Sequence, residues 1–271
     1  HAHDIFEHRY TDRLVAFRIG DAEWIRVISE FNRKFLHEKT GIDANHIEVV
    51  RCGIDVSKLR RSTAREKDAR KLIVSVGRLV PYKGHDILIR ACRQLKDQGV
   101  DLACKIVGDG PEHTALSRLI LELNLQDTIE LVGVLPHSEI CRILDIATVF
   151  ALACRRADDG AMDGIPVALM EAMAMELPVV TTAISGIPEL VEHGNTGLIA
   201  TTDDATDFGK CIMEVFADSN LAGQLGRNAR RKVESDFNQE TIAEVLADRI
   251  CLSASPGLVG EPPVIAKNPD A

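Results

Sequence analysis

Short runs of apolar, mostly β-branched residues alternate along most of the chain with longer stretches whose apolar positions follow a helical repeat. Runs of the first kind are typical of strands buried on both faces, and stretches of the second kind of helices that pack one side against a sheet. The clearest pair is a strand at 72–77 (LIVSVG) and a helix at 85–98, where Ile87, Ala91 and Leu95 share one face. The alternation predicts a parallel α/β sheet.

The same alternation continues to residue 200 and predicts a doubly wound, Rossmann-like sheet of about six strands. The further strands are expected at 102–108, 129–133, 149–153, 178–182 and 196–200, and the helices at 138–147, at 166–176 and from Pro111 onward. From Asp203 to about Leu252 the pattern is helical, and Gly223 and Asn238 are the expected breaks.

The two ends of the chain differ from this central part. The first 70 residues contain only two predicted strands, at 24–29 and 46–50, and a helix after Glu30, which is too little for an independent core. The chain begins at His1 without an initiator Met, so we interpret the sequence as a fragment. The expected organisation is the end of an upstream α/β domain at 1–56, a charge-rich linker at 57–70, one complete domain at 71–235, a terminal helix at 236–252 and a disordered, Pro- and Gly-rich tail at 253–271.

The amino-acid composition excludes several classes of function. The net charge of −9 argues against a nucleic-acid partner, because such proteins concentrate Lys and Arg to neutralise phosphates. A small phosphorylated ligand needs only one or two well-placed cations. No apolar run approaches the roughly 18 residues of a membrane-spanning helix, and no charged-then-apolar leader precedes the first element. The seven cysteines are widely spaced without a Cys-x-x-Cys pair, which predicts reduced core residues in the cytoplasm rather than a zinc site.

The segment 76–86 (VGRLVPYKGHD) carries the first candidate site. It places Arg78 and Lys83 in the loop that leaves the carboxyl end of the first strand of the sheet, the edge where ligands of open α/β sheets bind. Two cations around Gly77 and Gly84 can hold a diphosphate, since Arg offers a fork of donors and Lys a point charge. A solvated basic loop is the alternative if this motif is taken alone.

The segment 163–180 (DGIPVALMEAMAMELPVV) carries the second. Asp163 lies in a loop, and Glu171 follows after seven intervening residues in a helix that begins near Pro166. The first turn of that helix offers unpaired amides to an anion, and both carboxylates can accept hydrogen bonds from sugar and ribose hydroxyls. Glu171 could instead face solvent, but its apolar neighbours favour an enclosed position.

Together these motifs resemble the C-terminal domain of the family 4 (group 1) retaining glycosyltransferases, which share the GT-B fold and an acidic pair spaced E-x7-E. The similarity covers roughly residues 24–250, and the stretch 155–182 resembles colanic-acid-type and other exopolysaccharide enzymes. Asp163 departs from the family, where the first acidic position is Glu, so its carboxylate reaches one methylene less far. The supporting segments are 28–36 (ISEFNRKFL), 49–59 (VVRCGIDVSKL), 76–84 (VGRLVPYKG), 106–112 (IVGDGPE), 163–174 (DGIPVALMEAMA) and 185–199 (SGIPELVEHGNTGLI).

The resemblance also implies roles for single residues. Arg78 and Lys83, in the loop that starts at Gly77, would bind the donor diphosphate and stabilise the charge that grows on it. Asp163 would contact the donor sugar, and Glu171 the ribose. The remaining implied contacts are backbone amides near sugar and phosphate from Gly164, Ile165 and Pro166, and a base pocket lined by Gly133 and Val134. A catalytic histidine of the acceptor lobe would be His1 or His3, with His1 preferred; a frayed terminus without a role is the alternative.

The implied reaction transfers a hexose, with retention, from a UDP- or GDP-sugar to a lipid-linked oligosaccharide or polysaccharide acceptor. In the family the acceptor attacks from the face that the diphosphate leaves, and the leaving phosphate takes the acceptor proton; neither a metal nor a cofactor is expected. Association with the inner face of the cytoplasmic membrane would come from the missing part of the acceptor lobe. The fragment is expected to bind donor through 71–235 and to transfer no sugar alone, because that lobe is incomplete.

Three other functions compete with this one. The segment 108–113 (GDGPEH) follows a strand and opens a helix as in a nicotinamide-binding fingerprint, but His113 replaces its third glycine. A GT-B-fold epimerase or phosphorylase would share the fold without the transfer chemistry. A non-catalytic donor-binding subunit would need another chain for its acceptor half.

Overall fold

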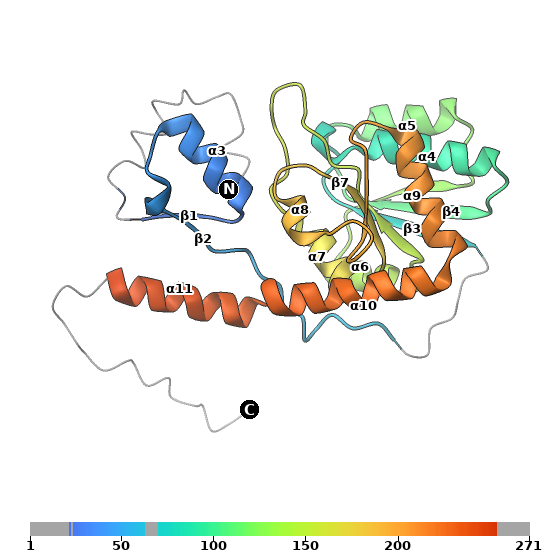
Figure 1. Cartoon of the computed structure of the whole chain (residues 1–271). Helices are drawn as coiled ribbons and strands as arrows, with labels where there is room; N and C mark the ends of the chain where they lie inside the picture. The colour runs from blue at the N-terminus through green and yellow to red at the C-terminus, as the bar shows by residue number, and fades with distance from the viewer. Residues whose placement is uncertain (1–21, 23, 63–69, 254–271) are drawn as a thin grey trace.

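The computed structural model describes residue 22 and residues 24–62 and 70–253, and within them the predicted six-stranded sheet is confirmed. All neighbouring strands are parallel, in the order β5-β4-β3-β6-β7-β8 (Figure 1). The strands are β3 (Lys71–Val76), β4 (Leu102–Val107), β5 (Ile129–Gly133), β6 (Val149–Ala151), β7 (Val179–Thr182) and β8 (Leu198–Ala200).

The order of the strands creates one switch point. The chain runs outward from β3 through β4 to β5, returns to β6 on the other side of β3, and continues outward to β7 and β8. Ile73 in the middle of β3 therefore pairs with Cys104 on one side and with Val149 on the other. The loops that leave β3 and β6 diverge at this point, which is where open α/β sheets bind ligands.

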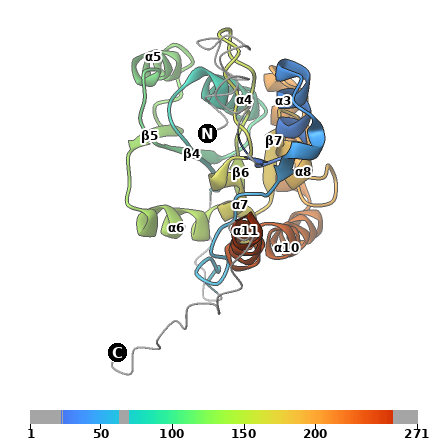
Figure 2. The same ribbon diagram turned by 90° about the vertical axis from the view of Figure 1, so that its left-hand side faces the viewer.

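Helices cover both faces of the sheet (Figures 1 and 2). One core joins the sheet to α4, α5 and α9 through residues such as Leu88, Leu116 and Phe208, and the other joins it to α6, α7 and the second half of α10 through residues such as Leu144, Met170 and Val233. The helices are α4 (His85–Asp97), α5 (His113–Glu122), α6 (His137–Ile146), α7 (Val167–Ala174), α8 (Ile187–Leu190), α9 (Ala205–Ala217) and α10 (Ser219–Asp236).

Two predicted helix boundaries are wrong. Helix α5 begins at His113 and not at Pro111, because the amide of Glu112 donates to the carbonyl of Leu79 and holds the preceding turn against the β3 loop. Gly223 lies inside α10 and breaks no helix. The break falls instead at Asp218, whose carboxylate accepts from the first amides of α10 and caps it, a gain that outweighs the roughly 1 kcal/mol cost of an internal glycine. The break at Asn238 is confirmed, since α11 (Gln239–Ser253) follows it.

The N-terminal part is small. Strands β1 (Ile25–Val27) and β2 (Ile47–Val49) pair in parallel, and α3 (Glu30–Thr40) and the short 3-10 helix η1 (Ala44–His46) connect them. Their core is formed by Val27, Leu36 and Ile47. Helix α11 runs below this unit in Figure 1, where the Arg249 guanidinium pairs with Glu48 at 2.8 Å and lies over the Trp24 ring. His1, His3 and the predicted tail beyond Ser253 lie outside the described residues.

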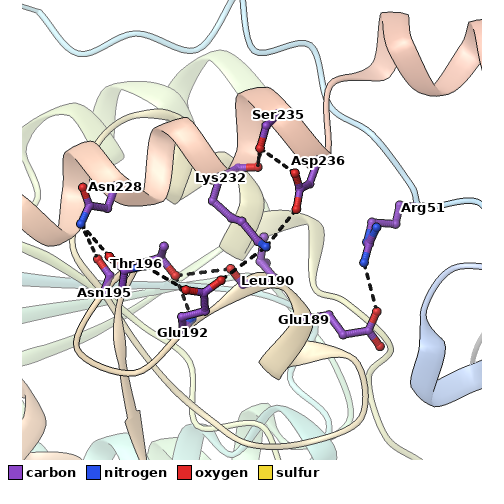
Figure 3. A network of polar contacts seen from close by, with 10 residues as sticks. All are labelled: Arg51, Glu189, Leu190, Glu192, Asn195, Thr196, Asn228, Lys232, Ser235 and Asp236. Atoms are coloured by element: carbon purple, nitrogen blue, oxygen red, sulfur yellow. Dashed lines mark hydrogen bonds and ion pairs between the residues drawn. The ribbon is translucent and has the colours of Figure 1, made fainter.

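Polar contacts join this N-terminal unit to the main domain. The Glu189 carboxylate, on α8, accepts hydrogen bonds from the backbone amides of Glu30 and Phe31 at 3.1 and 3.0 Å. These amides open α3, whose N-terminal end carries a partial positive charge that a carboxylate stabilises. The Arg51 guanidinium points toward the same carboxylate (Figure 3), at a distance of 3.4 Å. It also lies over the Phe237 ring. Glu189 thus connects the two parts through three donors.

A second group of polar contacts fixes α10 to the loop after α8 (Figure 3). The Lys232 ammonium lies 2.9 Å from the Asp236 carboxylate and 3.5 Å from that of Glu192. The Asn228 amide donates to the side-chain oxygen of Asn195 at 2.8 Å.

Across the described parts of the chain, no helix is long and apolar enough to cross a membrane.

Candidate functional site

The structure brings most of the predicted site residues to the carboxyl edge of the sheet, because parallel strands all end at that edge. Gly77 and Arg78 follow β3, Gly133 ends β5, and Asp163 lies in the loop between β6 and α7. These loops leave three different strands, so the candidate site is assembled by the order of the sheet and not by one continuous segment.

Lys83 and Asp163 form an ion pair across the switch point. Lys83 belongs to the short 3-10 helix η2 (Pro81–Lys83) after β3, while Asp163 comes from the loop after β6. Their side chains are only 12% and 21% exposed, so each charge depends on the other for much of its compensation. The two residues, expected to contact the diphosphate and the sugar, pair with each other in the structure.

The Lys83 side chain is enclosed. Its aliphatic stem lies over Gly77, where an added Cβ would come within 3.3 Å of Lys83 Cδ and Cε, so glycine leaves room for it. Burial is the largest single influence and lowers the pKa of Lys83, but the Asp163 carboxylate, Cys154 and Tyr82 together outweigh it, and the net pKa is raised. Lys83 therefore stays an ammonium in the site. An anion can bind it either in place of the Asp163 carboxylate or beside it.

Cys154 lies beside the Lys83–Asp163 pair. Its Sγ lies 3.8 Å from the Asp163 carboxylate. Burial, and then the negative charge of Asp163, raise the pKa of the thiol. Cys154 is therefore a neutral thiol that contributes packing and a weak donor to Asp163, not a nucleophile.

Arg78 differs from Lys83 in its setting. It is exposed, and among the residues that the structure describes its guanidinium has no ion-pair partner. Its backbone carbonyl accepts from the amide of Val80 at 2.9 Å, which fixes the turn that carries it. Arg78 thus offers a fork of donors in the same loop as the Lys83 ammonium, an arrangement suited to a diphosphate.

The loop from Asp163 leads directly into α7. Gly164, Ile165 and Pro166 are buried, and Pro166 precedes the first helical residue, Val167, in extended conformation. The first amide that bonds within the helix is that of Leu169, which donates to the Pro166 carbonyl at 3.1 Å. The preceding amides and the positive end of the helix dipole face the same edge of the sheet as Asp163.

Glu171 lies one turn further along α7 and is 17% exposed, as expected from its apolar neighbours. Its carboxylate contacts the Nε2 atom of His137, at the start of α6, at 3.0 Å. His137 was not predicted as a site residue; its one signal in the sequence is its position shortly after Gly133 and Val134. Gly133 has a left-handed φ of 80°, and the Val134 side chain is 76% exposed, so the predicted base-pocket segment offers apolar surface near His137 and Glu171.

His85 lies below the Gly77–Gly84 loop and was also missed. It is almost fully buried, with Nδ1 3.5 Å from the Ser75 hydroxyl. Burial, and then the charge of Lys83, lower the pKa of His85 to about 4, against the opposite influence of the Gly77 and Arg78 backbone. The ring is therefore neutral at physiological pH and supports the loop without adding charge.

The glycines of the competing nicotinamide fingerprint have a packing role. The segment 108–113 follows β4, not the strand at the switch point. Gly108 has a φ of 139°, and a Cβ there would overlap the carbonyl of Gly77; a Cβ at Gly110 would overlap that of Leu79. These glycines allow two loop backbones to touch. Among the described residues no group of three or more His, Cys, Asp or Glu side chains could hold a metal ion.

Comparison with known proteins identifies the family of this chain. The family described as Glycosyl transferases group 1 matches residues 57–232, more than half of the chain. The protein named as a colanic acid biosynthesis glycosyltransferase, WcaL, of Escherichia coli K12 is 40% identical over 211 residues, 78% of this chain and 52% of that protein. The amylovoran biosynthesis glycosyltransferase AmsK of Erwinia amylovora is 40% identical over 208 residues, 77% of this chain and 51% of that protein. The chain spans about half the length of these curated relatives.

Solved structures share the fold. HepE from Anabaena, in complex with UDP, superposes with a TM-score of 0.80 at 22% identity over 92% of this chain and 71% of that one. A glycosyltransferase from Rickettsia africae superposes with a TM-score of 0.79 at 20% identity, over 89% and 67% of the two chains. The chain belongs to the glycosyl transferases group 1 family, has the GT-B fold of its structural neighbours, and is related to enzymes of exopolysaccharide biosynthesis.

Proposed function

We propose that the chain supplies the nucleotide-sugar site of a retaining glycosyltransferase that passes a hexose from a nucleoside-diphosphate sugar to a lipid-linked glycan in surface polysaccharide synthesis. The observation that carries the proposal is the largely enclosed Lys83–Asp163 pair across the switch point, together with Arg78 in the same loop, whose guanidinium has no ion-pair partner among the described residues. The pair offers a cation for the diphosphate and a carboxylate for the sugar at adjacent positions.

In this arrangement Arg78 and Lys83 bind the two phosphates and stabilise the negative charge that develops as the bond to the sugar breaks. When the donor phosphate approaches Lys83, the Asp163 carboxylate is freed to accept from a sugar hydroxyl. The amides at the start of α7, before that of Leu169, would share this charge. Glu171, held by His137, would accept from the ribose hydroxyls, and Val134 would pack against the base.

Relatives and neighbours support a nucleotide-sugar donor. HepE is described in complex with UDP and with UDP-glucose, and a mycobacterial relative that is 28% identical is named as a GDP-mannose-dependent mannosyltransferase. Both nucleotides therefore belong in the experiment. The transfer step also needs an acceptor placed over the donor sugar, since orientation contributes several kcal/mol to such reactions.

Calorimetry with UDP, GDP and the parent nucleosides tests the donor site. We expect Arg78→Ala and Lys83→Ala each to weaken binding of the preferred diphosphate by about 1.5–3 kcal/mol, the contribution of a charge-assisted hydrogen bond, and to leave nucleoside binding nearly unchanged. Arg90→Ala, which removes an exposed arginine from α4, is the matched control and should bind as the unmodified chain does. Equal diphosphate affinity in all four proteins would refute the assignment.

A further inference from the structure

Arg155 makes an unusual set of contacts with the loop that carries Lys83. It follows β6 and is 22% exposed. Its Nε donates to the carbonyl of Pro81 at 2.9 Å, and its own backbone amide donates to the carbonyl of Tyr82 at 3.0 Å. One residue therefore holds both of the positions that precede Lys83 in the 3-10 helix η2.

The backbones are in direct contact at the same place. Gly84, which follows Lys83, has a left-handed φ of 63°, and a Cβ added there would overlap the carbonyl oxygen of Ala153. Gly84 also precedes the first residue of α4, so its position sets where that helix starts. The segment that leaves β6 thus contacts η2 through Ala153 on one side of Lys83 and through Arg155 on the other.

The charges around Arg155 indicate that it does not bind phosphate itself. Its terminal nitrogens face Asp86 at 3.1 and 3.3 Å and Asp203 at 3.5 Å. Glu112 is also close, since Arg155 acts to lower its pKa while burial and Asp86 raise it. A guanidinium has five N–H donors in a fixed plane, and those of Arg155 already point at a carbonyl and two carboxylates. Its charge is compensated within the protein, whereas Arg78 has no carboxylate partner among the described residues.

We propose that Arg155 is a positioning residue for the donor diphosphate, acting through Lys83. Its contacts with Pro81, Tyr82 and Asp86 fix η2 against the end of β6, so that the Lys83 ammonium stays at the switch point beside Asp163. This inference rests on the proposed function, in which Lys83 binds the diphosphate. Removing Arg155 then weakens phosphate binding only as long as Lys83 is present.

A double-mutant cycle tests this coupling, with UDP or GDP, whichever the unmodified chain binds more tightly, and the matching nucleoside as ligands. We expect Arg155→Met to weaken diphosphate binding roughly tenfold and to leave nucleoside binding unchanged. In the Lys83→Met background, the same substitution should change diphosphate affinity less than about twofold, because its effect is transmitted through Lys83. Arg156→Met is the matched control: it removes the exposed neighbouring arginine and should bind normally.

The outcomes separate the possible explanations. A tenfold loss that persists in the Lys83→Met background would overturn the proposal, since Arg155 would then contact phosphate directly. If Arg155→Met leaves diphosphate affinity unchanged in both backgrounds, while Lys83→Met alone weakens it, the proposal for Arg155 is overturned and the proposed function stays intact. Normal diphosphate binding by Lys83→Met itself would refute the proposed role of Lys83. If Arg155→Met does not fold, Asp86→Asn weakens the Arg155–Asp86 ion pair from the opposite side. This variant should lose affinity for the diphosphate and keep its affinity for the nucleoside. Normal diphosphate binding by Asp86→Asn would overturn the proposal.

Discussion

Substitution of Gly84 by alanine tests whether close backbone contact at the switch point holds the site together. Gly84 has a φ of 63°, where an L-residue costs about 1–2 kcal/mol. The added Cβ would also fall far inside the 3.0 Å limit of real Cβ contacts from the Ala153 carbonyl oxygen. One loop must then shift, at an overpacking cost of about 1–3 kcal/mol. We expect a total loss of about 2–5 kcal/mol in the free energy of unfolding.

Gly99 provides the matched control, because it lies just beyond the other end of α4. Its φ is 81°, yet nothing lies within 4 Å of an added Cβ, so Gly99→Ala has the conformational cost alone, about 1–2 kcal/mol. Urea unfolding followed by circular dichroism measures both variants, compared by midpoint at constant slope. Gly84→Ala should also bind UDP or GDP more weakly, since it displaces Lys83. Equal destabilisation of the two variants would refute the reasoning.

Two further predictions concern residues that the function does not use directly. Glu189→Ala removes the acceptor of the Glu30 and Phe31 amides, so we expect both amides to exchange hydrogen faster. Glu189→Gln keeps one acceptor oxygen and should show a smaller effect. Unchanged hydrogen exchange in Glu189→Ala would contradict the contact. The pKa of His85 is about 4 in the folded chain and 6.5 in the unfolded chain, so the unfolded chain takes up the proton first as the pH falls. The contribution of His85 to the free energy of unfolding is therefore complete above about pH 6.5. It falls by up to about 3 kcal/mol as the pH drops toward 4. His85→Gln should remove that part of the pH dependence in urea unfolding between pH 4 and 7, and an unchanged slope would contradict the burial argument.

The sequence determined the elements and the edge at which ligands bind. Strands such as 72–77 are short, apolar and β-branched, so their burial between two layers of helices follows from composition alone. Since every parallel strand ends at the same edge, the placement of Arg78, Lys83 and Asp163 at one edge follows as well. The helix boundaries at Pro111 and Gly223 were wrong, because a contact with Leu79 and the cap at Asp218 decided them instead.

Only the tertiary structure decided which residues meet. The return of the chain to place β6 next to β3 sets Asp163 against Lys83 and Arg155 against Pro81, although 80 and 74 positions separate them. His137 meets Glu171 for the same reason, across 34 positions. Periodicity reports which face of a strand or helix is buried, but loops have no period, and their contacts depend on the order in which the strands pair. The local pattern therefore determined the edge of the sheet, and the strand order determined the site.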